Sequence, residues 1–337
     1  MVNSEEDSKF LQKALQEPNP RYKSDNQPSL FSTKELLRGN ILEIVNQQSE
    51  PQLLYKHPNG AIYTGDSLKW LSSLSCESVD LMIADPPYNI KKAEWDSFQS
   101  QQVYVDWSLQ WIEQAARVLK PNGTLYVCGF SEILADIKLP ALKYFEGCRW
   151  LVWHYKNKAN LRSDWGRSHE SILHFRKSKD FTFNIDDIRI PYGKHTTKYP
   201  ERTQAETSQY GKGNEKRRKQ VWRPHPKGAK PRDVIEIPTT CNGMNETTPH
   251  PTQKPEELFR KLVLASSNKG DLVVDPFLGS GTTAVVSEQL KRQWMGCDMS
   301  TDYCHWAIER IELVKNWSVP KWIEHDLSNA NRRKSIR

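Results

Sequence analysis

Residues 271–290 read DLVVDPFLGSGTTAVVSEQL and predict a strand, a glycine-rich turn and a helix in immediate succession. The apolar run up to Asp275 is typical of a buried strand, and the helix opens with hydroxyl residues that are suited to capping. Gly279 and Gly281 would let the backbone of the turn approach a bound ligand closely. Such units are common in α/β proteins, so the function of this one depends on the sequence around it.

The segment that follows this helix predicts the next strand. It runs from Arg292 to Asp298 and ends in a carboxylate about 20 residues beyond the turn, where nucleoside-binding α/β folds place the acidic residue that holds the ribose hydroxyls. The turn is not of the form G-x-G-x-x-G, and no clear dinucleotide fingerprint follows it. We therefore expect a single adenosyl group as the ligand rather than a dinucleotide.

A second informative stretch is Asp85-Pro86-Pro87-Tyr88, at the end of the apolar run 79–84. The Asp85 carboxylate can accept one hydrogen of an exocyclic amine on a nucleobase. The prolines fix the backbone and remove two donors, so that a local carbonyl such as that of Pro86 can accept the second hydrogen. The Tyr88 ring offers a stacking face worth about 1–3 kcal/mol per base. The alternative interpretation is a strand followed by an ordinary proline turn.

The two stretches together resemble the amino-methylating DNA methyltransferases that use S-adenosylmethionine. Their order along the chain, with the tetrapeptide before the glycine-rich turn, resembles the circularly permuted beta class of that family. The resemblance covers roughly residues 54–312. Three further segments carry it: 63–66 (YTGD), 153–156 (WHYK) with 168–175 (SHESILHF), and 250–255 (HPTQKP).

The resemblance implies roles for individual residues. The catalytic residues would be Asp85, Pro86, Pro87 and Tyr88. The residues expected to contact the cofactor are Asp66, Thr252, Lys254, Asp275, Phe277, Gly279, Ser280, Gly281, Thr282 and Asp298. Two of these have simple alternatives: Asp66 could simply cap the helix that follows it, and Lys254 could be an ordinary exposed residue at a helix start.

The expected reaction is direct methyl transfer to the amine of a base that has left the DNA stack. In the family an aspartate at position 85 favours adenine N6, whereas serine is usual for cytosine N4, so we favour adenine and keep cytosine as the alternative. No cysteine is expected beside the tetrapeptide, which argues against methylation of a cytosine ring carbon. Asn89, Trp95 and Asp96 are expected in a loop over the flipped base.

A strongly basic region lies between the two halves of the predicted site. Residues 185–233 hold 13 lysines and arginines against six acidic residues, an excess that equals the net charge of +7 for the whole chain. Its position predicts a target recognition region that neutralises DNA phosphates and reads base edges. The candidate DNA-binding residues are Lys216, Arg217, Arg218, Lys219 and Arg223. A solvated loop is the alternative interpretation.

Strands and helices alternate along the chain, which predicts a doubly wound, mostly parallel Rossmann-like α/β sheet. We expect strands at 61–64, 79–84, 123–128, 149–155 and 170–176, and helices at 67–74, 104–119 and 256–266. The expected divisions are a polar N-terminal extension with two short helices (1–52), a catalytic half (53–183), a target recognition region (184–240), a cofactor-binding half (241–315) and a C-terminal tail (316–337).

Composition limits the remaining possibilities. No apolar run approaches the roughly 20 residues that span a bilayer, and the six cysteines form no C-x-x-C pair, so we expect a cytoplasmic protein without a metal. The expected partner is double-stranded DNA, with a homodimer and a separate restriction endonuclease left open. The functional alternatives are an RNA or protein amide methyltransferase, and a DNA-binding subunit without catalysis.

Overall fold

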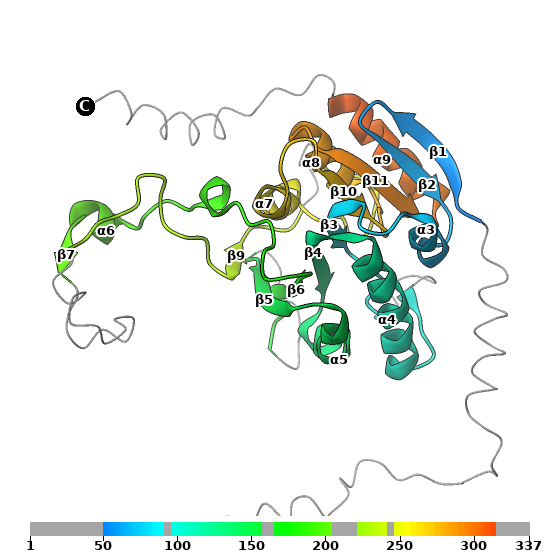
Figure 1. Cartoon of the computed structure of the whole chain (residues 1–337), viewed down its shortest axis with the longest axis horizontal. Coiled ribbons are helices and arrows are strands. Elements are labelled where there is room, and N and C mark those ends of the chain that lie inside the picture. Colours follow the sequence, from blue (N-terminus) through cyan, green and yellow to red (C-terminus); the bar gives the residue numbers. More distant parts are fainter. Residues whose placement is uncertain (1–49, 91–95, 157–164, 204–220, 241–245, 315–337) are drawn as a thin grey trace, which may run out of the picture. The chain divides into compact units, whose positions relative to one another are not determined.

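The structure, a computed structural model, describes residues 50–90, 96–156, 165–203, 221–240 and 246–314. Within these ranges the chain is organised around a nine-stranded sheet with the strand order β1-β2-β11-β10-β3-β4-β6-β5-β9 (Figure 1). The strands are β1 Gln52–His57, β2 Gly60–Thr64, β3 Val79–Ala84, β4 Leu119–Gly129, β5 Gly147–His154, β6 His169–Arg176, β9 Val234–Glu236, β10 Leu272–Asp275 and β11 Gln293–Asp298. The two predicted N-terminal helices, residues 216–219 and the C-terminal tail 316–337 lie outside the described residues.

The centre of the sheet is parallel, as predicted. Strands β2, β11, β10, β3 and β4 are parallel to one another, whereas β1 pairs antiparallel with β2 at the edge. Every residue of β3 is buried, as expected for a parallel strand that is covered on both faces. Because the carboxyl ends of parallel strands meet at one edge, the residues after β3 and β10 lie at the same edge of the sheet.

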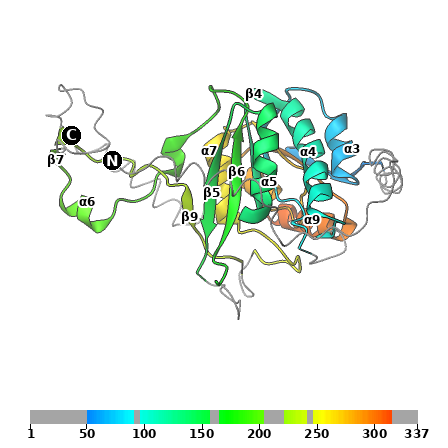
Figure 2. The ribbon, with the colours of Figure 1, turned by 90° about the horizontal axis from the view of Figure 1, so that it is seen from below.

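Helices cover both faces of the sheet. Alternate residues of β3 point to opposite faces, so each face of this strand packs against a different set of helices. Met82 and Ala84 belong to a core formed with α3, α4 and α5, whereas Leu81 and Ile83 belong to one formed with α7. Figure 2 shows α3, α4 and α5 side by side. The helices are α3 Ser67–Ser73, α4 Gln101–Val118, α5 Ser131–Ala141, α7 Glu256–Ser266, α8 Thr282–Gln289 and α9 Thr301–Val314.

Two elements, β3 and α7, occupy the residues that the sequence predicts. Helix α4 begins at Gln101 rather than Tyr104, because the Ser100 side chain accepts a hydrogen bond from the Val103 amide and caps an earlier turn. Strand β4 begins at Leu119 rather than Gly123, since Leu119 pairs with Val79 of β3. Hydrogen bonds therefore extend both elements beyond their apolar patterns.

The last strands of the sheet run differently. Strand β6 is antiparallel to both β4 and β5, and β9 adds to the edge in parallel with β5. Strand β9 falls inside the segment 184–240 that we predict as a target recognition region. The end of that segment is thus a strand of the main sheet.

The rest of the basic region is held at a few backbone points. It includes the short helices η3 Ile185–Ile188 and α6 Lys194–Lys198 and a two-stranded sheet of β7 Arg202–Thr203 and β8 Val221–Trp222. The Asn184 amide donates to the Ala265 carbonyl at 2.7 Å, and Ile190 pairs with Ala229. No helix in the described part of the chain is long and apolar enough to cross a membrane.

Candidate active site

Asp85 is the first residue after β3, and its carboxylate is engaged on both oxygens. Lys254 Nζ donates to Asp85 Oδ1 at 2.9 Å and to Oδ2 at 2.7 Å, and the Tyr88 hydroxyl donates to Oδ1 at 2.6 Å. Lys254 precedes α7, so the pair joins the segment before that helix to the end of β3. The structure thus brings together three residues that the sequence places in the site.

A second carboxylate, that of Glu170 on β6, lies beside the first. Its Oε2 is 3.6 Å from Lys254 Nζ and 3.3 Å from the Tyr88 hydroxyl oxygen, whose single hydrogen can turn to either carboxylate. The Lys254 side chain is only 6% exposed, so its charge depends on these two anions rather than on water. We call Asp85, Tyr88, Glu170 and Lys254 the carboxylate–lysine cluster.

The surroundings fix the protonation of the two donors in this cluster. Burial lowers the pKa of Lys254, but the charges of Asp85 and Glu170 outweigh it and raise that pKa above its ordinary value. Burial, followed by the same two carboxylates, raises the pKa of the Tyr88 phenol. At neutral pH, Lys254 is therefore an ammonium and Tyr88 a neutral donor.

Three members of the carboxylate–lysine cluster line a cavity of about 400 Å³, and Asp85 contacts two of them. Tyr88, Glu170 and Lys254 line it together with Phe130, Trp153, the threonines 239, 240, 247, 248 and 252, and the segment 249–253. The Tyr88 and Phe130 rings meet edge to face at 5.0 Å between centroids. The Arg167 guanidinium lies 3.8 Å from the centroid of the Phe130 ring. A cavity with aromatic walls and a carboxylate suits a flat ring that carries an amine.

The loop after the tetrapeptide is fastened by its own side chains. The buried Asp96 carboxylate accepts the amide hydrogens of Tyr88 at 2.6 Å and Ile90 at 3.2 Å, and Asn89 Oδ1 accepts that of Phe98. Asp96 and Asn89 therefore hold the backbone that carries Tyr88. Trp95, which we expect in the same loop, lies outside the described residues.

One expectation about this site is wrong, because a cysteine does lie beside it. Val127 of β4 pairs with Ala84, which places Cys128 next to Asp85 at the strand ends. Burial raises the pKa of the Cys128 thiol, and the Asp85 charge raises it further. The thiol is 2% exposed and stays protonated, so it is no nucleophile. The pairing of β3 with β4 brings it there, and local sequence gives no sign of that.

The glycine-rich turn after β10 has the conformation that its sequence suggests. Gly279 and Gly281 have φ values of +50° and +80°, in the left-handed region that favours glycine. The Gly279 amide donates to Asp298 Oδ2 at 2.8 Å, so Asp298 braces the turn from β11. A Cβ on Gly279 would lie 3.1 Å from His250 Nε2, and His250 also lines the cavity. Turn and cavity are therefore neighbours.

Asp275 and Phe277 hold the start of the turn. The Asp275 carboxylate accepts hydrogen bonds from the Thr283 hydroxyl and the Phe277 amide, and burial raises its pKa to about 7. The Phe277 ring packs against Trp107 and Trp111 of α4. Burial also raises the pKa of Asp298.

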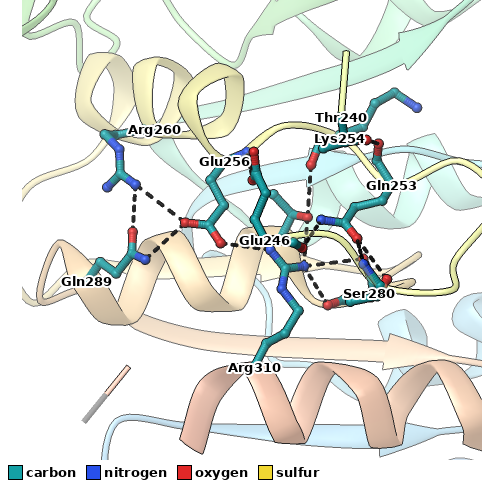
Figure 3. Close-up of polar contacts among 11 residues, drawn as sticks. Thr240, Glu246, Gln253, Lys254, Glu256, Arg260, Ser280, Gln289 and Arg310 are labelled. Carbon is teal, nitrogen blue, oxygen red and sulfur yellow. Dashed lines mark hydrogen bonds and ion pairs between the residues drawn. The ribbon is translucent and has the colours of Figure 1, made fainter. Parts of the chain in front are cut away.

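Ser280 and Thr282 face inward, toward Arg310 of α9. Arg310 Nη1 donates to the Ser280 carbonyl at 2.8 Å and to Thr282 Oγ1 at 3.1 Å, while Nη2 donates to Glu256 at 2.8 Å (Figure 3). The Thr282 hydroxyl donates in turn to the Lys254 carbonyl at 3.2 Å. The Thr282 hydroxyl thus connects the turn to the segment that carries Lys254.

That segment, residues 246–256, is fastened by Gln253. Its Oε1 accepts from the Thr248 amide and hydroxyl, its Nε2 donates to the Glu246 carbonyl, and its own carbonyl accepts from Thr240 (Figure 3). Glu246 Oε2 accepts the Glu256 amide hydrogen at 2.8 Å. The backbone before α7 is therefore fixed on both sides of Lys254.

The remaining site residues divide into two groups. Asp66 caps α3 by accepting the Lys69 amide hydrogen at 2.8 Å, which is the simple alternative that the sequence leaves open. Thr252 lines the cavity. Sequence reasoning missed Glu170 and Arg310 as site residues. A glutamate near the start of β6, two residues before the buried pair Ile172 and Leu173, is the signal that could have indicated the first.

A sequence model of the N6/N4 family of DNA methylases matches residues 79–309, which include both β3 and the glycine-rich turn. The chain belongs to this family of DNA methyltransferases.

Type II methyltransferase M.HpaI from Haemophilus parainfluenzae is 35% identical over 258 residues, covering 74% of this chain and 74% of the relative. DNA adenine methyltransferase YhdJ from Escherichia coli strain K12 is 32% identical over 283 residues, covering 81% and 88%. The solved PvuII DNA methyltransferase, described as cytosine-N4-specific, superimposes with a TM-score of 0.58 at 21% identity and covers 83% of this chain and 94% of that one. It shares the fold.

Proposed function

We propose that this protein transfers the methyl group of S-adenosylmethionine to the exocyclic amine of a base in double-stranded DNA, and that the base is adenine, methylated at N6. The observation that carries the proposal is the Asp85 carboxylate at the carboxyl end of β3, beside a cavity that Tyr88 and Glu170 line. Membership of the DNA methylase family supports it.

The residues around the turn fit the cofactor. Backbone at positive φ without a side chain at Gly279 leaves open the space that a Cβ would take, and His250 borders both that space and the cavity. We assign the turn 278–282, Phe277 and Asp298 to its adenosyl part and Thr252 to its methionine part. When bound, S-adenosylmethionine supplies an electrophilic methyl group.

The protein's own groups prepare the amine. An aromatic amine is a poor nucleophile because its lone pair is delocalised into the ring. By accepting a hydrogen from the amine, Asp85 favours a tetrahedral nitrogen whose lone pair is directed out of the ring plane, and the cavity walls fix its direction. The Tyr88 ring stacks with the flipped base and offsets part of the cost of unstacking.

Two finer assignments rest on sequence. The order of the chain, with β3 before β10, supports the circularly permuted beta class. Aspartate at position 85 supports adenine, as does the relative YhdJ, which is named a DNA adenine methyltransferase. Cytosine N4 remains the second candidate, because the same carboxylate can hold either amine.

The basic region supports DNA as the substrate. Among its described residues, Lys198 lies beside the exposed Tyr199 ring, and Arg223, with a side chain that is 73% exposed, pairs with the exposed Glu201 at the surface. Lys and Arg of this kind neutralise phosphates. Lys216, Arg217, Arg218 and Lys219 are proposed on sequence alone.

The experiment is methyl transfer from labelled S-adenosylmethionine to unmethylated duplex DNA, followed by nucleoside mass spectrometry. Asp85→Ala should lower the rate by about 100-fold or more, since it removes the acceptor of the amine hydrogen. Asp106→Ala, at an exposed position of α4, is the control and should match the wild type.

N6-methyladenine in the product would support the adenine assignment, and N4-methylcytosine would replace it. If the wild type binds S-adenosylmethionine but leaves DNA unmodified while it methylates RNA or a glutamine peptide, the proposal is wrong.

A further inference from the structure

We propose that Glu170 is a positioning residue for methyl transfer, which takes over the Lys254 ammonium when the target amine binds Asp85. The inference rests on the proposed function and deepens it, because it assigns a task to a carboxylate that the reaction does not otherwise use. It also gives Lys254 two positions, one for each carboxylate.

The starting point is that Asp85 is already occupied. An ionised carboxylate offers about four lone-pair positions. Lys254 Nζ takes one on each oxygen, at 2.9 and 2.7 Å, and the Tyr88 hydroxyl takes another on Oδ1. One position, on Oδ2, is left by these three contacts, so an amine that donates a hydrogen to Asp85 must share that oxygen with the Lys254 ammonium unless the ammonium moves away.

A displaced ammonium needs another anion close by. Lys254 is 6% exposed, and an unpaired charge at such a position is costly. Among the described residues, its ion pairs are with Asp85 and with Glu170, whose Oε2 is already 3.6 Å from Nζ. A small rotation of the lysine chain exchanges one partner for the other.

Tyr88 can follow the same exchange. Its hydroxyl donates to Asp85 at 2.6 Å and lies 3.3 Å from Glu170 Oε2, so it sits between the two carboxylates. Turning the hydroxyl toward Glu170 frees a further lone pair on Asp85. The backbone of both donors stays in place, since Asp96 holds Tyr88 and Thr282 holds the Lys254 carbonyl.

Two other roles for Glu170 predict different behaviour. Glu170 lines the cavity and could contact the base directly, in which case its task does not depend on Lys254. It could also serve stability alone. A double-mutant cycle between positions 170 and 254 separates these roles, because Lys254→Met leaves no ammonium to relocate.

The test measures single-turnover methyl transfer to unmethylated plasmid DNA, with enzyme in excess, for the wild type, Glu170→Gln, Lys254→Met and the double variant. Calorimetry gives the Kd for S-adenosylmethionine, and thermal unfolding checks each fold. Glu170→Gln should slow transfer about 10- to 100-fold, because the ammonium then stays on Asp85, and should change the cofactor Kd less than about twofold. In the Lys254→Met background, Glu170→Gln should slow methyl transfer by less than about a further twofold. Glu170→Asp, which keeps the charge, should recover part of the loss.

Equal slowing by Glu170→Gln in both backgrounds would overturn the proposal in favour of direct base contact, and no slowing in either would overturn it outright. If Glu170→Gln does not fold, Glu170→Asp is compared in the wild-type and Lys254→Met backgrounds. Slower transfer in the wild-type background alone supports the proposal, and equal slowing in both contradicts it. A wild type that binds the cofactor but methylates no DNA would instead sink the proposed function, and the inference with it.

Discussion

The carboxylate–lysine cluster and the glycine-rich turn lie at the ends of neighbouring parallel strands, yet they are built in opposite ways. The cluster presents ionised side chains, with Asp85, Glu170 and Lys254 grouped beside the cavity. The turn presents backbone, with Gly279 and Gly281 at positive φ. One half of the site depends on charge and the other on shape.

The charged residues near the turn hold its backbone in this conformation. Asp298 accepts the Gly279 amide hydrogen, Asp275 accepts that of Phe277, and Arg310 donates to the Ser280 carbonyl. All three act on the backbone of the turn. Substitutions at the cluster should therefore remove catalysis and leave the fold, whereas substitutions at the turn should affect stability and cofactor binding together.

The largest effect is expected from Gly281→Ala, which disturbs the packing and backbone conformation of the turn and changes no charge. The new Cβ would lie 2.5 Å from the Ala307 Cβ, and φ is +80°, so the variant combines a clash with backbone strain. We expect a loss of about 2–4 kcal/mol in the free energy of unfolding, measured with urea, and weaker binding of S-adenosylmethionine.

Gly193→Ala is the matched control, because a Cβ there meets nothing within 4 Å and its φ is −63°. It should cost about 1 kcal/mol or less, the loss of a glycine at a helix N-cap. Similar losses in the two variants would mean that the turn has no special backbone requirement, and the contrast between shape and charge would fail.

A smaller effect is expected from Arg310→Met, which removes the donors to Ser280, Thr282 and Glu256 but no ligand-facing group. Stability should fall by about 1–3 kcal/mol, since buried acceptors lose their partners. The Kd for S-adenosylmethionine, measured by calorimetry, should rise because the turn loses its support.

Arg260→Met sharpens this prediction. Arg260 is equally buried and also pairs with Glu256, but it contacts Glu257 and Gln289 rather than the residues of the turn. This variant should lose stability and keep its cofactor affinity. If both variants weaken cofactor binding alike, Arg310 has no particular role in holding the turn.

The same contrast explains how much of the molecule could be predicted from sequence. The parallel sheet, the bounds of β3 and α7 and the glycine conformations follow from local patterns, since burial and backbone freedom are properties of consecutive residues. The placement of Asp85 and of the Gly279 turn at one edge followed from the alternation of strands and helices.

The contacts between segments did not follow. Lys254 pairs with Asp85 across 169 positions of sequence, and nothing in HPTQKP indicates that its ammonium meets that carboxylate. Glu170 was missed and the nearness of Cys128 was predicted wrongly for the same reason. Both depend on the order of strands β3, β4 and β6, which no periodicity encodes.

The smallest effect is expected from the ionisation of Asp275. Because burial raises its pKa to about 7, the folded protein keeps this proton to higher pH than the unfolded chain does. The contribution to stability is therefore full at low pH, falls as pH rises from the unfolded value of about 4 toward 7, and levels off above that. Between about pH 6.5 and about pH 8 the free energy of unfolding should fall by about 1 kcal/mol on this account.

Asp275→Asn tests this, because an amide resembles the protonated acid. Its oxygen can accept the Phe277 amide hydrogen and its nitrogen can donate to Thr283. The free energy of unfolding of the variant, measured with urea, should not show this fall with pH, so the variant becomes more stable relative to the wild type as pH rises. Asp106→Asn, at an exposed position, should show the same pH dependence as the wild type. Parallel curves for Asp275→Asn and the wild type would mean that Asp275 is ionised throughout, and that the turn, like the cluster, carries a buried negative charge.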